Sequence, residues 1–309
     1  MPDSPYLLEV KNLTTRFDIT DGIFARPKAR VHAVEGISFN ILPGETLSLV
    51  GESGCGKTTA GRTIVGLQEA TSGDIIFEGR SVNNYSRKER LDFCRSVQMI
   101  FQDPYSSLNP RMSIGKTLAE PIDVHKLDVP NGTTNRILDL LQKVNLQPAF
   151  AKRYPHEFSG GQRQRVSIAR ALALQPKLIV CDEAVSALDV TIKAQVINLL
   201  MDLQVEYNLS YLFISHDMAV VERISHRVAV MYLGRIVEIG PREAIFENPS
   251  HPYTKKLLSA VPVADPRLRR MDRSLNVEEI PSAVRKLDYI PQPISYNEIS
   301  PGHLVAVEG

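Results

Sequence analysis

The sequence predicts an α/β fold with a mostly parallel sheet, an antiparallel β portion and an inserted all-helical subdomain. Three short apolar runs, at residues 46–50, 178–181 and 211–215, each end in polar residues, as strands do when helices cover both faces of a parallel sheet. Between the second and third runs, one apolar stripe recurs at helical spacing and includes Ile192, Val196, Leu199, Leu200 and Leu203. This segment predicts a strand, a crossover helix and a second, parallel strand.

The stretch from about residue 113 to residue 174 predicts several helices and no strand. Within "TTNRILDLLQKVNL" (133–146), one helical face carries the apolar residues Ile137, Leu140, Leu141 and Val144. We therefore expect an all-helical subdomain inserted into the α/β part of the chain.

The segment that follows the third strand predicts smaller elements. "HRVAVMYLGRIVEIG" (226–240) predicts two strands joined at Leu233-Gly234, and short helices follow in residues 242–261. Prolines and mixed charges then dominate. We expect one domain over residues 1–260 and an irregular C-terminal extension over residues 261–309.

Composition excludes several classes of protein. Lys and Arg total 36 against 35 Asp and Glu, for a formal net charge of +1, so no overall field points to nucleic acid. We find no secretory h-region at the start and no run of about eighteen apolar residues, the length that a membrane-spanning helix needs. The three cysteines, Cys55, Cys94 and Cys181, show no paired or metal-binding spacing. This usage suits a reducing compartment, and the cytoplasm is the expected one.

"GESGCGKTT" (51–59) satisfies the phosphate-loop pattern between a predicted strand and a predicted helix. Such a loop needs glycine where the backbone wraps around phosphate oxygens, which identifies a P-loop NTPase fold. We expect Lys57 to reach the β- and γ-phosphates and Thr58 to bind Mg²⁺. For Cys55, an acidified and reachable thiol and a small side chain that merely fits are both open. The expected ATP-binding residues of the loop are Gly51, Glu52, Ser53, Gly54, Cys55, Gly56, Lys57, Thr58 and Thr59.

Polar residues follow other predicted strands of the sheet. Asp182 and Glu183 come directly after an apolar run, where ligands of open α/β sheets bind. Asp182 suits a water-mediated Mg²⁺ contact, and Glu183 suits a general base toward the attacking water. His216 is a candidate γ-phosphate sensor or a structural hydrogen-bonding residue. Gln102 could contact the metal or the water.

"FSGGQRQR" (158–165) is a second glycine-rich helix start. Ser159, Gly160, Gly161 and Gln162 offer bare N–H groups and a hydroxyl that could cap the helix or donate to a phosphate. One nucleotide inside its own loop needs no second anion cradle. The simplest explanation is that this helix start serves a nucleotide bound by another subunit.

These motifs, in this order, resemble the ATP-binding cassette (ABC) family over roughly residues 7–260. The family calls them Walker A ("GESGCGKTT"), Q-loop ("FQDP"), signature ("FSGGQRQR"), Walker B ("LIVCDE"), D-loop ("SALD", Ser186, Ala187, Leu188 and Asp189) and H-switch ("ISHD"). The resemblance implies a head-to-tail dimer with two ATP molecules, each between one subunit's Walker A and the other's signature. It implies catalytic roles for Glu183, His216, Gln102 and Lys57. It implies Mg²⁺ at Thr58, Gln102 and Asp182.

The chain looks most like the ATPase subunits of peptide and nickel importers, through "QMIFQDPYSSLNPRMSIG" (98–115) and "NPSHPYTKKLLSAVP" (248–262). Phe17 falls where the family stacks an aromatic ring on adenine, although a long insertion follows it and Tyr6 or Phe24 could compete. Some members carry an iron–sulfur centre near the C-terminus. Because no cysteine follows Cys181, we expect the subunit class that lacks this cluster.

The resemblance implies an ATP-hydrolysing motor subunit of a peptide-type importer at the cytoplasmic face of the inner membrane. Expected partners are a second ABC ATPase subunit, two transmembrane permease subunits and an extracytoplasmic solute-binding protein, with no nucleic acid. A heterodimer is favoured over a homodimer. A soluble ABC ATPase acting on nucleic acid or ribosomes is the alternative, and a non-catalytic regulatory cassette is a third. Di- or oligopeptides, glutathione, nickel complexes and opines stay open as cargo.

Overall fold

The computed structural model describes residues 4–21, 26–103, 105, 107–130, 132–260 and 282–307. The strands are β1 (Leu8–Asp21), β2 (Arg26–Ile41), β3 (Thr46–Val50), β4 (Ser72–Phe77), β5 (Arg80–Ser81), β6 (Val97–Ile100), β7 (Leu178–Asp182), β8 (Ser210–Ser215), β9 (Arg227–Tyr232), β10 (Arg235–Pro241), β11 (Val284–Arg285), β12 (Ser295–Ser300) and β13 (His303–Val307). The α-helices are α1 (Lys57–Ile64), α2 (Arg87–Ser96), α3 (Ile114–Val124), α4 (Thr133–Lys143), α5 (Gly160–Leu172), α6 (Val190–Tyr207), α7 (Met218–Ile224), α8 (Arg242–Glu247) and α9 (Pro252–Ser259).

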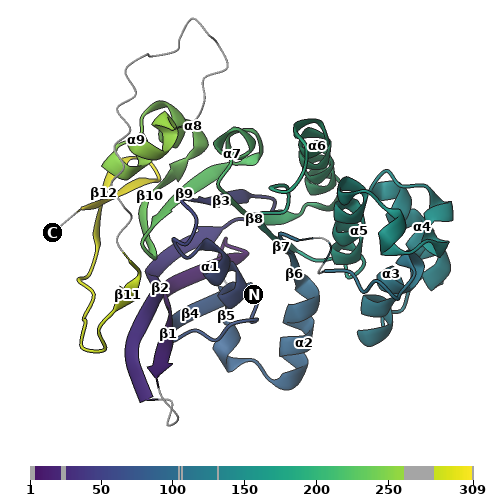
Figure 1. Ribbon diagram of the computed structural model, residues 1–309, viewed down its shortest axis with the longest axis horizontal. Helices are drawn as coiled ribbons and strands as arrows, with labels where there is room; N and C mark the ends of the chain where they lie inside the picture. The colour runs from purple at the N-terminus through teal and green to yellow at the C-terminus, as the bar shows by residue number, and fades with distance from the viewer. Residues whose placement is uncertain are drawn as a thin grey trace, which may run out of the picture.

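The larger sheet has eight strands in the order β12-β13-β10-β9-β3-β8-β7-β6 (Figure 1). Its strands β9, β3, β8, β7 and β6 run parallel, and β10, β13 and β12 are added antiparallel at one side. The predicted apolar runs are β3, β7 and β8, and every residue of these strands is buried. The predicted crossover helix is α6, which connects β7 to the parallel strand β8.

Helices cover both faces of the parallel strands, as their continuous apolar sequence requires. On one face α1 lies between the two sheets, and its buried Ala60 and Ile64 pack in one cluster with Leu49 of β3 and Leu13 of β1. On the other face α5 and α6 belong to the cluster that contains the buried Phe213 of β8. The parallel strands are therefore packed between helices on both faces, which fixes the positions of the loops at their ends.

The predicted helical stretch forms α3, α4 and α5, which lie to one side of the large sheet (Figure 1). The described residues between 113 and 174 contain no strand. Three predicted residues of the apolar face, Ile137, Leu140 and Leu141, are buried in α4. The separation of these helices as a subdomain, and the division of the chain near residue 260, stay predictions.

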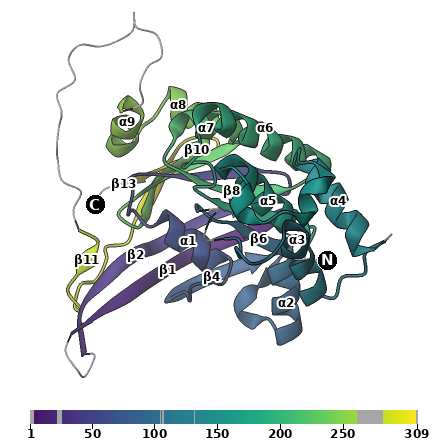
Figure 2. The same ribbon diagram turned by 45° about the vertical axis from the view of Figure 1, so that its right-hand side comes forward.

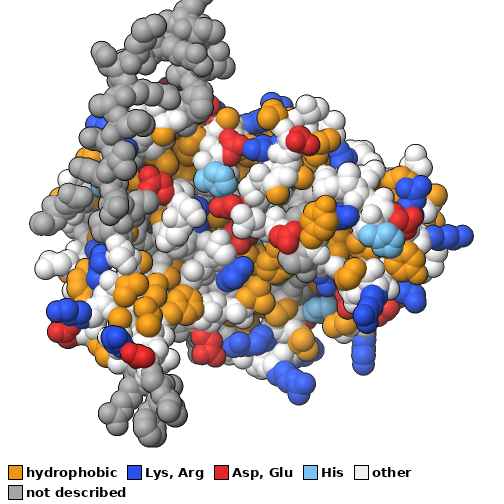
Figure 3. All heavy atoms as spheres, in the orientation of Figure 1, with side chains coloured by type: hydrophobic (Ala, Val, Ile, Leu, Met, Phe, Trp, Pro, Cys, Tyr) orange, Lys and Arg blue, Asp and Glu red, His pale blue; other side chains and the backbone are white. Residues whose placement is uncertain are grey.

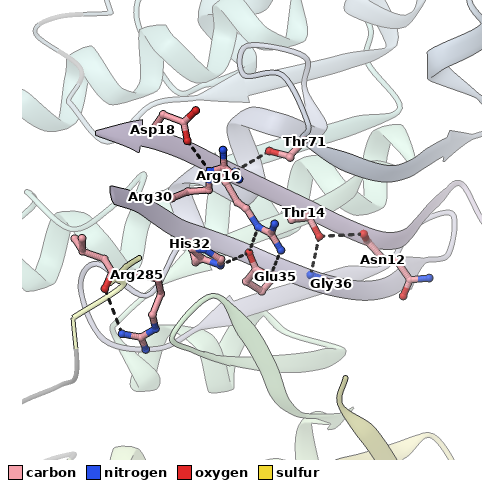
Figure 4. A network of polar contacts seen from close by, with 11 residues as sticks. Asn12, Thr14, Arg16, Asp18, Arg30, His32, Glu35, Gly36, Thr71 and Arg285 are labelled. Atoms are coloured by element: carbon pink, nitrogen blue, oxygen red, sulfur yellow. Dashed lines mark hydrogen bonds and ion pairs between the residues drawn. The ribbon is translucent and has the colours of Figure 1, made fainter. Parts of the chain in front are cut away.

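The smaller, antiparallel sheet has the order β11-β2-β1-β4-β5. The insertion after Phe17 lengthens β1 and β2 into a two-stranded ribbon that projects from the molecule (Figure 2). Polar contacts hold the ribbon together: Arg16 donates from Nε and Nη2 to the two carboxylate oxygens of Glu35, at 2.6 and 2.9 Å. His32 Nδ1 lies 2.8 Å from Glu35 Oε1, so the three side chains turn toward one another (Figure 4).

The C-terminal segment departs from the expected irregular course. Residues 261–281 and 308–309 lie outside the described part of the chain, but β12 and β13 form a hairpin that pairs with β10. Without this hairpin, β10 would be an edge strand. The N–H and C=O groups along such an edge are unpaired and are able to form hydrogen bonds with another strand. In "HLVAV" the first residue, His303, is 2% exposed and faces the core. The irregular expectation is therefore wrong for this hairpin.

None of the helices in the described part of the chain is both long and apolar enough to cross a membrane.

Candidate active site

Four neighbouring strands of the parallel sheet end at one edge. The strand register places Val50 of β3 beside Ser215 of β8, Ile214 of β8 beside Asp182 of β7, and Cys181 of β7 beside Ile100 of β6. The loops that leave these strands begin with the residues that the sequence singles out. The fold therefore brings the phosphate loop (residues 51–58) together with Asp182, Glu183, His216 and Gln102.

The phosphate loop is enclosed by its own chain. Gly51 and Gly56 have φ angles of +150° and +107°, which side chains disfavour. A Cβ on Gly51 would lie 2.2 Å from the carbonyl oxygen of Met231, and one on Gly56 would lie 2.0 Å from that of Ala33. The helix α1 then begins at Lys57 with no side-chain cap. Its first N–H groups are thus available to an anion.

Lys57 is 4% exposed and turns back on this loop. Its Nζ donates to the carbonyl oxygens of Gly51 at 2.7 Å and Glu52 at 2.8 Å. The ammonium group therefore lies inside the loop, where it suits contact with a phosphate.

Thr58 and Asp182 meet directly. The Thr58 hydroxyl donates to Asp182 Oδ1 at 2.7 Å, and Asp182 is 2% exposed. Burial raises the pKa of Asp182, although the Thr58 hydrogen bond opposes the shift. Mg²⁺ in nucleotide sites is held by few protein oxygens besides the phosphates. A buried carboxylate beside a hydroxyl fits that role, because a cation would compensate its charge.

Glu183 is held from two sides. Its Oε2 accepts from Gln102 Nε2 at 2.7 Å, and its Oε1 lies 3.2 Å from His216 Nδ1. The Glu183 side chain is 14% exposed, whereas that of His216 is 54% exposed. Glu183 also has a φ of +47°, a conformation that occurs at functional sites where the surroundings impose it. A carboxylate fixed in this way is able to orient a water molecule and take its proton.

The D-loop residues follow Glu183 closely. Ser186 donates from both its backbone N–H and its hydroxyl to the Glu183 carbonyl oxygen, at 3.0 and 2.9 Å. Ala187 and Leu188 continue the turn, and Asp189 occupies the N-cap position of α6. The D-loop is therefore tied to the backbone of Glu183.

The signature start forms an N-terminal cap on α5. The Gln162 N–H donates to Ser159 Oγ at 3.4 Å, and the Ser159 N–H donates to Gln162 Oε1 at 3.0 Å. A Cβ on Gly161 would lie 2.4 Å from Ile192 Cγ2, whereas one on Gly160 would find nothing closer than Leu188 Cδ2 at 3.9 Å. Gly161 thus serves helix packing, whereas nothing in the described chain would clash with a Cβ on Gly160.

Phe17 lies on β1 and is 36% exposed. Two residues earlier on the same strand, the Thr15 hydroxyl lies 3.1 Å from that of Thr63 in α1. Hydrophobic side chains gather on the surface where β1, β2 and β11 lie (Figure 3). Of its rivals, Tyr6 precedes β1 at the other end of the strand, and Phe24 lies outside the described residues. The contact of Phe17 with adenine stays a prediction.

Of the two alternatives for Cys55, burial favours the small side chain over the acidified thiol. Cys55 is 6% exposed, and burial raises its pKa. The opposing effect of Lys57, whose Nζ lies 3.6 Å from Cys55 Sγ, is smaller. A small side chain that fills space inside the loop agrees with this burial.

Among the residues that touch the phosphate loop, sequence reasoning missed Tyr253. The Glu52 N–H donates to the hydroxyl of Tyr253 at 2.9 Å. Tyr253 belongs to "NPSHPYTKKLLSAVP", 201 positions from Glu52. The motif indicated a branch of a family, but nothing in it indicated this contact.

The fold and the site define a nucleotide-binding protein of the phosphate-loop class. Residues 34–186 match the ABC transporter family, and residues 237–287 match the C-terminal region of oligopeptide/dipeptide transporters. The chain belongs to the ABC transporter family, and its C-terminal part is similar to that of oligopeptide/dipeptide transporters.

Relatives of known name are similar over nearly the whole chain. The glutathione import ATP-binding protein GsiA of Escherichia coli (strain K12) is 56% identical over 304 residues, which cover 98% of this chain and 49% of that protein. GsiA of Pectobacterium atrosepticum is 55% identical over 300 residues, covering 97% and 48%. The chain thus spans about half the length of these relatives.

Solved structures share the fold. CbiO1 from Clostridium perfringens, described as part of the ABC transporter complex cbiONQ, has a TM-score of 0.67 and 27% identity, covering 79% of this chain and 92% of that one. A dimeric structure of the ATP-binding cassette MJ0796 in a post-hydrolysis state, bound to ADP and Pi, has a TM-score of 0.66 and 26% identity, covering 76% and 98%.

Proposed function

We propose that this chain is the ATP-hydrolysing motor subunit of a peptide-type ABC importer, converting ATP and water to ADP and phosphate. The observation that carries the proposal is Glu183, which Gln102 and His216 hold at the sheet edge that bears the phosphate loop. This arrangement supports hydrolysis rather than nucleotide binding alone, because it supplies a base oriented by two other groups.

The phosphate loop binds ATP in this proposal. Its amide groups and Lys57 hold the phosphates, and the adenine lies on Phe17. Mg²⁺ is held by Thr58 and Asp182, with Gln102 near the water. When bound, it offsets negative charge on the phosphates.

Glu183 takes the proton of the attacking water, and His216 contacts the γ-phosphate. The 14% exposure of the Glu183 side chain supports its role, since partial burial keeps the carboxylate in place while leaving access for water.

A second ABC ATPase subunit completes each site. Ser159, Gly160, Gly161 and Gln162 of one subunit approach the γ-phosphate bound by the other, so that ATP closes a head-to-tail dimer and hydrolysis reopens it. The absence of any clash for a Cβ on Gly160, which would meet only Leu188 Cδ2 at 3.9 Å, supports this role, as does the dimeric form of the similar cassette MJ0796. We propose a heterodimer, with the homodimer as its rival.

Two transmembrane permease subunits and an extracytoplasmic solute-binding protein complete the importer. The chain would act from the cytoplasmic face of the inner membrane as a peripheral subunit, without nucleic acid as a partner. Similarity to proteins named for glutathione import makes glutathione, a small peptide, the first cargo to test.

The test of the motor role is Glu183→Gln in the chain assembled with its membrane partners. We expect ATP affinity within about twofold of the original and turnover lower by about a hundred- to ten-thousandfold, the usual worth of a positioned general base. Glu243→Gln is the matched control, because the Glu243 side chain is 75% exposed on α8. Full turnover of Glu183→Gln would show that another group activates the water.

The alternative, a soluble ABC ATPase acting on nucleic acid or ribosomes, predicts a different activator. Turnover should rise with permease subunits in membranes and not with DNA, RNA or ribosomes. The reverse pattern would replace the importer proposal.

A further inference from the structure

Tyr253 connects the C-terminal region to the phosphate loop. It is the second residue of α9 and is 8% exposed. Its hydroxyl oxygen accepts from the Glu52 N–H at 2.9 Å. Glu52 is the second residue of the loop, so this amide is bound by the protein itself at the point where the backbone leaves β3.

Several neighbours restrain Tyr253. It packs against the ring of Tyr232, with 4.3 Å between the centroids. It belongs to an apolar cluster with Val50 of β3 and Val237 of β10. Its own N–H donates to His251 Nδ1 at 3.1 Å. The surroundings therefore hold the hydroxyl in one position relative to the loop.

A buried carboxylate in turn fixes the start of α9. Glu238 is fully buried on β10, and its two oxygens accept from the N–H groups of Ser250 at 2.8 Å and His251 at 3.0 Å. His303 Nε2 of β13 lies 2.7 Å from Glu238 Oε1. A continuous set of hydrogen bonds thus runs from the C-terminal hairpin through Glu238 and His251 to Tyr253 and the phosphate loop.

We propose that Tyr253 is a positioning residue that holds the first turn of the phosphate loop ready for ATP. The inference rests on the proposed function, since it assumes that residues 51–58 bind the nucleotide. Without the hydroxyl, the Glu52 amide is left without its acceptor and the loop samples other conformations. The apparent affinity for ATP then falls in proportion to the fraction of molecules whose loop keeps the ATP-binding conformation. Once ATP is bound it fixes the loop itself, so turnover at saturation is unchanged.

The test is Tyr253→Phe in the full chain, which removes one oxygen and keeps the ring. By calorimetric titration with Mg-ATP we expect a dissociation constant raised about threefold to tenfold, the worth of one hydrogen bond. The kcat with membrane partners should stay within about twofold. Hydrogen exchange at the Glu52 amide should speed up. Tyr232→Phe is the matched control, because it alters the same ring pair and leaves the Glu52 bond intact.

Lys57→Ala separates failure of this inference from failure of the proposed function. If Lys57→Ala abolishes ATP binding while Tyr253→Phe leaves affinity and exchange unchanged, the tyrosine is only structural and the inference is wrong. If Lys57→Ala binds ATP normally, the loop assignment itself fails. A lower melting temperature of Tyr253→Phe with unchanged affinity would also overturn the inference, as would a fall in kcat alone.

Discussion

The two glycine-rich helix starts of this chain use glycine for different reasons. In the phosphate loop, Gly51 and Gly56 have positive φ angles, and a Cβ on either would strike backbone of the same chain. At the signature start no glycine has a positive φ. There Gly161 makes room for a side chain of α6, while a Cβ on Gly160 would make only an ordinary contact with Leu188.

The helix caps differ in the same way. At α1, whose N-cap position is Gly56, no side chain accepts a hydrogen bond from the first N–H groups of the helix. At α5, Ser159 and Gln162 cap each other's backbone. The first start is thus shaped by its own fold to receive an anion. The second is capped by its own side chains, and nothing in the described chain requires glycine at Gly160.

Gly56→Ala should have the largest effect in this comparison. Its methyl group would lie 2.0 Å from the Ala33 carbonyl oxygen at a φ of +107°, so the loop must move away from β2. Overpacking of this kind is typically worth about 1–3 kcal/mol, which corresponds to about tenfold to a hundredfold weaker ATP binding. Calorimetric titration measures the change. Gly54→Ala is the control, because a Cβ there would have nothing within 4 Å, although its φ is also positive, at +81°. Equal losses would mean that backbone conformation, and not the clash, decides.

Gly160→Ala should act on turnover and not on folding. A methyl group finds only Leu188 Cδ2, at 3.9 Å, and alanine favours a helix more than glycine does. If a neighbour's γ-phosphate approaches this bare backbone, the methyl group obstructs it. We expect turnover of the assembled protein to fall about tenfold, with ATP affinity of the isolated chain and its melting temperature unchanged. Full turnover would show that nothing approaches Gly160.

Local patterns in the sequence singled out residues that the fold brings to one edge of the sheet. Each of the strands β3, β7 and β8 is a short apolar run that a few adjacent residues are enough to predict, and the polar loop that follows it is read from the next few residues. The fold then brings Gln102, Glu183 and His216 together because parallel strands end at a common edge.

Contacts that depend on the order of strands could not be predicted. Tyr253 reaches Glu52 only because β9 pairs with β3 and α9 follows β10, which no motif encodes. The strand β13 was missed because its partner edge, β10, is recognised only once the sheet is built. The burial of Cys55 likewise depends on the packed loop around it.

Gly161→Ala should have the smallest effect, and it tests whether the second helix start is built for packing. A Cβ would lie 2.4 Å from Ile192 Cγ2, so α5 and α6 must shift or Ile192 must change rotamer. We expect the free energy of unfolding to fall by about 1–2 kcal/mol, partly offset by the helix preference of alanine. Denaturant titration of the single variants and of the double variant with Ile192→Ala gives their coupling. Because Ile192→Ala removes the clashing methyl group, the double variant should lose less than the sum of the two single losses. Additive losses would mean that Gly161 is not there to accommodate Ile192. The glycine at this position would then have to be explained by something outside the described chain.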